Sequence, residues 1–153
     1  MPTEYILAYH CAPAFAGIKP SNIASCSKRE NPNITVQIKM LNEKLNKNDI
    51  YINVLCECGE RVLLMVYRKQ KLCEYLQRDD IKSFLCDNDY PKEFSLMKYL
   101  AILKSRIYTQ RFMNKEFPHE IGAFLGYPLH DIYGFINHKH QGCLLTGEWK
   151  VYE

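Results

Sequence analysis

The chain has 153 residues, of which 47% are hydrophobic and 24% are charged, and its formal net charge is +3. This length is typical of one folded domain, and the composition is that of a globular chain and not of a disordered one. We therefore expect a single domain over residues 1–153. The slight positive charge argues against a nucleic-acid-binding protein, in which a basic stripe normally dominates the composition.

No segment approaches the roughly 20 consecutive apolar residues that a membrane-spanning helix needs. The N-terminus also lacks a basic region followed by an apolar stretch, which argues against a signal peptide and indicates a cytoplasmic protein. The chain has seven cysteines. An odd number of cysteines without an export signal predicts free thiols and no disulfide framework.

The first part of the chain reads as short helical turns and loops. Residues 4–10 predict one or two helical turns that end before Pro13, because a proline holds the preceding residue out of the α region. Residues 14–19 predict a loop around a glycine. The run 20–22 predicts the start of a short helix. We expect the polar segment 25–33 to be exposed.

The middle of the chain has the clearest periodic patterns. An amphipathic helix is predicted where four apolar residues share one helical face: Ile34, Ile38, Leu41 and Leu45. Residues 50–57 and 61–67 predict the two strands of a hairpin. The second strand is apolar on both faces, which favours a central position in its sheet.

The second half of the chain is mainly helical in pattern. Its predicted helices cover residues 70–77, 79–86, 94–112, 118–125 and 129–138, and a final strand is predicted over 143–152. The fold class that follows is α+β, in which a small antiparallel sheet packs with several helices. We expect the sheet to combine the hairpin 50–67 with the strand 143–152, and the segment 118–138 to form a helical hairpin.

The most distinctive segment is Phe117-Pro118-His119-Glu120-Ile121-Gly122-Ala123-Phe124-Leu125-Gly126-Tyr127-Pro128. Because Pro118 suits the first turn of a helix, His119 and Glu120 are expected at a helix N-terminus, where free N–H groups attract anions. Gly126 fits the turn between two helices.

Four segments resemble a bacterial domain-of-unknown-function family, number three-seven-nine-three, whose members come mostly from anaerobic Firmicutes. They are Tyr9-His10-Cys11-Ala12-Pro13, Ala16-Gly17-Ile18-Lys19-Pro20, the stretch Pro118–Pro128 and Trp149-Lys150-Val151-Tyr152. The resemblance implies a stand-alone cytosolic protein with no established activity. Many members continue beyond the position of Glu153 into a further helix, which raises the hypothesis of a homo-oligomer that completes the core.

The leading functional hypothesis is a small thiol-dependent enzyme, or a redox or ligand-binding protein, with a site between the 10–20 loop and residues 118–128. A nucleophilic cysteine needs a lowered pKa, which a nearby imidazole or lysine supplies. The proposed roles are nucleophile or redox thiol for Cys11, acid/base for His119, orienting carboxylate for Glu120, and ligand contacts for Lys19, His10 and Tyr127. The competing interpretation is that Cys11 is simply packed and that Glu120 stabilises its own helix terminus.

Two other function classes stay open. The first is a non-enzymatic module that binds a small molecule or a protein in a groove lined by aromatic side chains. The second is a helix-turn-helix nucleic-acid binder, which is disfavoured because the expected recognition helix has no lysine or arginine before Lys139. We predict no metal site, since Cys56 and Cys58 lack a second ligand pair at zinc spacing. The sequence identifies no cofactor.

Overall fold

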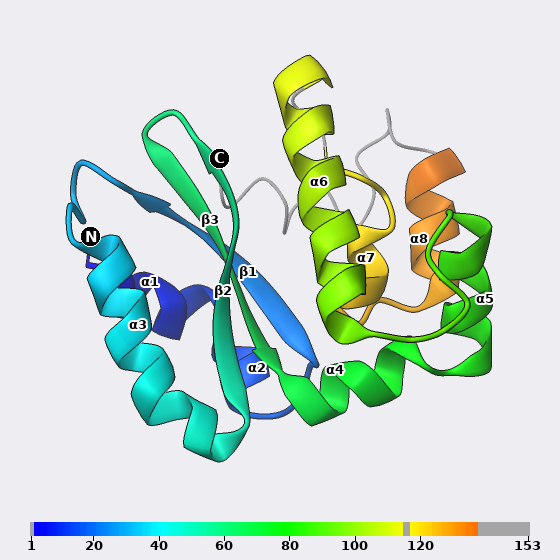
Figure 1. Ribbon diagram of the computed structural model, residues 1–153, viewed down its shortest axis with the longest axis horizontal. Helices are drawn as coiled ribbons and strands as arrows, with labels where there is room; N and C mark the ends of the chain where they lie inside the picture. Colours follow the sequence, from blue (N-terminus) through cyan, green and yellow to red (C-terminus); the bar gives the residue numbers. More distant parts are fainter. Residues whose placement is uncertain (1, 115–116, 138–153) are drawn as a thin grey trace. The chain divides into compact units, whose positions relative to one another are not determined.

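The computed structural model describes residues 2–114 and 117–137, and its fold class is α+β, as predicted (Figure 1). The chain forms two compact units, of which the first ends at Leu72 and the second begins at Cys73. The expected single domain stays a prediction. No helix within the described ranges is long and apolar enough to cross a membrane.

The first unit surrounds a three-stranded antiparallel sheet with the strand order β1-β3-β2. Its elements are α1 (Thr3–His10), α2 (Ala12–Phe15), β1 (Ser21–Ser27), α3 (Ile34–Leu45), the 3₁₀ turn η1 (Asn46–Asn48), β2 (Ile50–Cys58) and β3 (Arg61–Arg68). The predicted helix 34–45 and hairpin are therefore confirmed. Strand β3 is central, and all of its residues from Val62 to Tyr67 are buried, as its apolar sequence indicated.

Strand β1 overturns two expectations. Residues 20–22 do not start a helix, and most of the segment 25–33 is not exposed. The side chains from Ser21 to Cys26 are buried. The polar residues of this strand make it look like an exposed segment in the sequence. They can be buried because their polar groups have hydrogen-bond partners inside the unit. Asn22 Oδ1 accepts the N–H of Ala14 at 2.8 Å, and Arg61 Nε donates to Ser25 Oγ at 2.9 Å. The predicted strand 143–152 lies outside the described residues.

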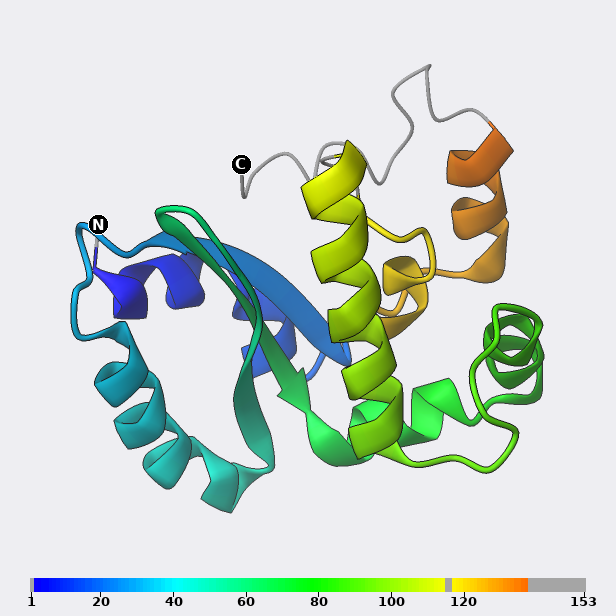
Figure 2. The ribbon, with the colours of Figure 1, turned by 45° about the horizontal axis from the view of Figure 1, so that its top comes forward.

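Helices α1, α2 and α3 pack against the same face of this sheet, as the two ribbon views show (Figures 1 and 2). The strand register explains the arrangement. Asn22 and Ile52 both pair with Val66, so the three residues lie in one row across the sheet. Asn22 bonds to the α2 backbone at the β1 end of this row. At the β2 end, Asn42 of α3 bonds to the backbone of Ile52.

The second unit is helical in the part that the structure describes. Helix α4 (Lys69–Leu76) contains the boundary between the units, and it is followed by α5 (Asp79–Asp87), α6 (Leu96–Asn114), α7 (Ile121–Phe124) and α8 (Leu129–Asn137). Tyr90, Tyr99 and Phe124 form an aromatic cluster in its core, with ring centroids 5.2 and 5.9 Å from that of Tyr90.

The predicted helix 118–125 is shorter than expected, because only residues 121–124 are α-helical and residues 119–120 form a turn. Helix α7 ends at a turn that contains Gly126, as the sequence predicted. Gly126 has φ +83°, its N–H donates to the carbonyl of Ala123, and the N–H of Tyr127 donates to the carbonyl of Gly122. This Schellman arrangement requires a left-handed residue, which favours glycine.

Candidate functional site

The distinctive segment places Glu120 in the interior of the second unit. The side chain is 2% exposed. Its Oε2 atom accepts one hydrogen bond from Arg106 Nη1 at 2.6 Å and one from the Tyr90 hydroxyl at 3.0 Å. The guanidinium also lies over the Tyr90 ring, 4.8 Å from its centroid. These contacts tie the turn before α7 to helix α6 and to the residues after α5.

The pKa values in this cluster follow from burial and from the Glu120 charge. Burial, followed by the charge of Glu120 and its hydrogen bond, raises the pKa of the Tyr90 hydroxyl above its usual range. Burial by itself lowers the pKa of Arg106, but the hydrogen bond to Glu120 and its charge outweigh that effect and raise it. The carboxylate therefore acts as an internal counter-ion for Arg106, and together with burial it favours the protonated form of the Tyr90 hydroxyl.

His119 is half-buried next to this cluster. Its Nε2 atom lies 2.9 Å from Asn88 Oδ1, and its ring packs edge-on to Phe84 with the centroids 6.2 Å apart. The Asn88 amide also donates to the carbonyl of Phe84 at 2.8 Å. The imidazole is thus held by a side chain that is itself bonded to the end of α5.

The predicted site residues of the 10–20 loop lie in the first unit. Cys11 has no exposed surface, its N–H donates to the Leu7 carbonyl at 2.8 Å, and its carbonyl accepts the N–H of Phe15. His10 packs edge-on to Tyr9, and burial lowers the pKa of its imidazole. Lys19 is half-buried.

Within the second unit His119 and Glu120 are adjacent, and the carbonyl of Tyr127 accepts the hydroxyl of Tyr75 at 2.8 Å. The proposed partnership of Cys11 with His119 joins the two units, so it stays a prediction. Among the described residues, no group of three or more His, Cys, Asp or Glu side chains is arranged to hold a metal ion.

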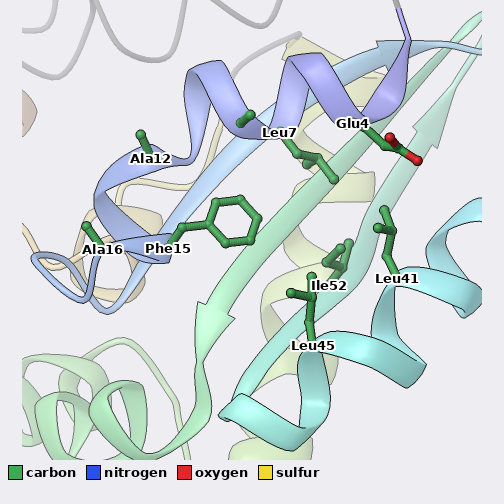
Figure 3. A pocket seen from close by; sticks show the side chains of 9 residues that line it. Glu4, Leu7, Ala12, Phe15, Ala16, Leu41, Leu45 and Ile52 are labelled. Carbon is green, nitrogen blue, oxygen red and sulfur yellow. The ribbon is translucent and has the colours of Figure 1, made fainter.

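The first unit contains a cavity of about 600 Å³ that the sequence interpretation did not find. It lies between α1 and α2 on one side and α3 on the other, with strand β2 beneath (Figure 3). In Figure 3 the Leu7 and Phe15 side chains extend toward those of α3, and Glu4 lies at the end beside Leu41. The lining residues are Glu4, Leu7, Ala8, Ala12, Phe15, Ala16, Leu41, Leu45 and Ile52.

The apolar face of α3 forms one wall of the cavity. Ile34 and Ile38, in its first half, are packed at 7% exposure each. Leu41 and Leu45, in its second half, are only half-buried and line the cavity. Asn42 holds this half of the helix to the sheet edge, since its side chain accepts the N–H of Ile52 at 2.8 Å and donates to the Ile52 carbonyl at 3.0 Å.

The opposite wall is fixed by two cations from the end of β3 and the start of α4. Arg68 Nε donates to the carbonyl of Ala14 at 2.9 Å, and its Nη2 donates to the carbonyl of Phe15. Lys71 Nζ donates to the carbonyl of Gly17. Cations are favourable at the C-terminal end of a helix, where backbone carbonyls lack internal partners. Both walls are therefore held in place by side-chain hydrogen bonds to main-chain groups.

One sequence signal for this cavity was available. Ala8, Ala12 and Ala16 follow one another at intervals of four residues and all line the cavity. Alanine takes up less of the cavity than a larger apolar side chain at these positions would. The pattern does not stand out in the sequence, because the three alanines belong to different elements, α1, α2 and the turn after α2.

The comparisons with known proteins give a family and no activity. A family model described as a protein of unknown function (DUF3793) matches residues 7–153. No curated protein and no solved structure matches the chain at a significant level. Since the match covers nearly the whole sequence, the chain belongs to the DUF3793 family of proteins of unknown function.

Proposed function

We propose that this protein is a cytoplasmic, non-enzymatic ligand-binding module whose first unit takes up an apolar small molecule. The observation that carries the proposal is the cavity of about 600 Å³ between α1–α2 and α3. Small-molecule sites in proteins typically measure roughly 300–1,000 Å³ and are lined mainly by apolar side chains with few polar groups. This cavity has that size and that lining.

The fixed walls strengthen the proposal. Asn42 pins α3 to strand β2, and Arg68 pins α2 to the end of β3. A cavity that is already formed does not have to be assembled by its ligand, which reduces the ordering cost of binding. Contact with the apolar lining supplies the driving force, about 0.8 kcal/mol for each methylene group that leaves water.

A neutral fluorescent probe, N-phenylnaphthylamine, tests the proposal in the full-length chain. We expect saturable binding of one probe per chain. Ala12→Phe should lower the affinity at least tenfold, because the added ring occupies the cavity that Ala12 lines. Ala101→Phe is the matched control, since Ala101 is an exposed alanine of α6 in the second unit. Unsaturable binding, or equal affinity in the wild type and Ala12→Phe, would exclude the cavity as the site.

The thiol-dependent enzyme is the competing proposal, and the adjacent His119 and Glu120 are the observation in its favour. The two proposals differ in which thiol reacts first with iodoacetamide. If the protein is a binding module, Cys58, which is exposed in β2, should be modified before the buried Cys11 and Cys26. Burial also raises the pKa of the Cys26 thiol, which lowers its thiolate fraction.

Mass spectrometry after peptide digestion gives the modification rate of each thiol. If Cys11 reacts faster than Cys58 in the native protein, and His119→Ala abolishes the difference, the thiol enzyme is the better description. If Cys11 reacts only after denaturation, catalysis by this cysteine is excluded.

A further inference from the structure

We propose that the cavity of the first unit selects amphiphiles with a cationic head group, such as a protonated amine at the end of an apolar chain. The inference rests on the proposed binding function and adds the ligand class. It assigns a specificity-determining role to Glu4, the carboxylate at the end of the cavity beside Leu41 (Figure 3).

The charge pattern of the lining is the first argument. Of the nine side chains that line the cavity in the described structure, only Glu4 is charged, and the others are alanine, leucine, isoleucine and phenylalanine. Figure 3 shows the carboxylate at one end, away from Ala12 and Ala16 at the other. A ligand that fills this space therefore meets apolar walls along its length and a single negative charge at one end.

The second argument is that no ion pair between described residues includes Glu4. In the described part of the chain, the ion pairs join Lys28 to Glu57, Arg78 to Asp80 and Arg106 to Glu120, and none of them includes Glu4. A ligand cation would supply the missing partner. A carboxylate head group would instead approach a like charge, and a neutral head group would gain no ion pair.

The exposure of Glu4 determines how strongly the cavity should prefer a cationic head group. Glu4 is exposed in the first turn of α1, so water and salt screen its interactions. Exposed ion pairs contribute modestly, and the expected preference for a cationic over a neutral head group is about two- to fivefold in affinity. The preference should shrink as the salt concentration rises.

Displacement of bound N-phenylnaphthylamine by decylamine, decanol and decanoate tests the inference, with each ligand kept below its micelle concentration. In the wild type, decylamine should bind most tightly and decanoate most weakly. Glu4→Gln should bring the three affinities together. Glu43→Gln is the matched control, since Glu43 is an exposed glutamate of α3 outside the cavity. Thermal unfolding of both variants separates an effect on the ligand from a loss of α1, which an acidic residue in the first turn stabilises.

The outcomes distinguish this inference from the function on which it rests. If the probe itself does not bind the wild type, the binding proposal fails and the inference fails with it. If the probe binds but none of the three ligands displaces it, the binding proposal stands and the inference is overturned. Equal displacement by all three, or a preference for decylamine that persists in Glu4→Gln, leaves the cavity as a binding site and overturns the role of Glu4. A preference that Glu4→Gln abolishes, and Glu43→Gln preserves, supports the inference.

Discussion

The first unit of this protein contains a cavity, whereas the second unit builds a conspicuous sequence segment into its core. The second unit buries Glu120 of its distinctive segment, which accepts hydrogen bonds from Arg106 and Tyr90, and it leaves His119 half-buried. The first unit leaves an open cavity lined with ordinary leucines and alanines. The comparison shows that a dense motif can serve the architecture, whereas the cavity proposed to bind a ligand is lined by residues that form no conspicuous motif.

The Glu120 cluster provides the strongest test of an architectural role. Arg106→Met should destabilise the protein by about 3 kcal/mol, because it leaves a buried carboxylate without its cation. Arg78→Met should cost less than about 1 kcal/mol, since its pair with Asp80 is exposed. Urea unfolding measures both free energies. Similar values for the two variants would mean that the cluster does not hold the second unit together.

The two asparagine contacts sharpen the comparison between the units. Asn42→Ala and Asn88→Ala each remove two hydrogen bonds and should each cost about 1–2 kcal/mol. Only Asn42→Ala should also weaken probe binding, because it releases one wall of the cavity. A loss of probe affinity in Asn88→Ala would contradict a site confined to the first unit. Urea unfolding and probe titration of both variants provide the measurements.

Glycine substitutions test the turn that ends α7. Gly126→Ala should cost about 1–2 kcal/mol, since its φ of +83° is unfavourable for any residue with a Cβ atom. Gly134→Ala should instead stabilise the protein by up to about 1 kcal/mol, because a Cβ there meets no atom within 4 Å and alanine favours the helix. Thermal unfolding gives the sign of each change. A neutral Gly126→Ala would remove the geometric reason for the glycine in this segment.

The smallest expected effect concerns Tyr90 and depends on pH. At neutral pH, Tyr90→Phe should cost about 1 kcal/mol, the worth of its hydrogen bond to Glu120. The raised pKa of Tyr90 in the folded state means that its contribution is complete below the ordinary tyrosine pKa of about 10, and is lost as the pH rises above it. The difference between wild type and variant should therefore shrink in alkaline urea unfolding. A constant difference would indicate that the hydroxyl is not buried against Glu120.

The sequence predicted the elements that have strong periodicity. The helix 34–45 and the hairpin were confirmed because their apolar patterns repeat over several turns or residue pairs. Strand β1 was missed because its buried polar residues find partners in distant segments, Asn22 with the α2 backbone and Ser25 with Arg61. Such pairs become visible only when the chain has folded.

The candidate site was harder to predict than the fold. The sequence shows that His119 and Glu120 are neighbours, but the bond of Glu120 to Arg106 spans 14 residues and its bond to Tyr90 spans 30. The cavity could not be predicted from its lining residues. It arises from the distance between two helix faces, which Asn42 and Arg68 fix through hydrogen bonds to the main chain of Ile52, Ala14 and Phe15.

The clamp that Arg68 forms on α2 also has a consequence for folding order. Arg68 and Ala14 are 54 residues apart, as are Lys71 and Gly17. Contacts of such long range form slowly, because a large loop must close before they contribute. During synthesis the wall of the cavity formed by α2 can be fixed only after β3 and the start of α4 have left the ribosome. We therefore expect the cavity to mature late, well after α1 and α2 have been made.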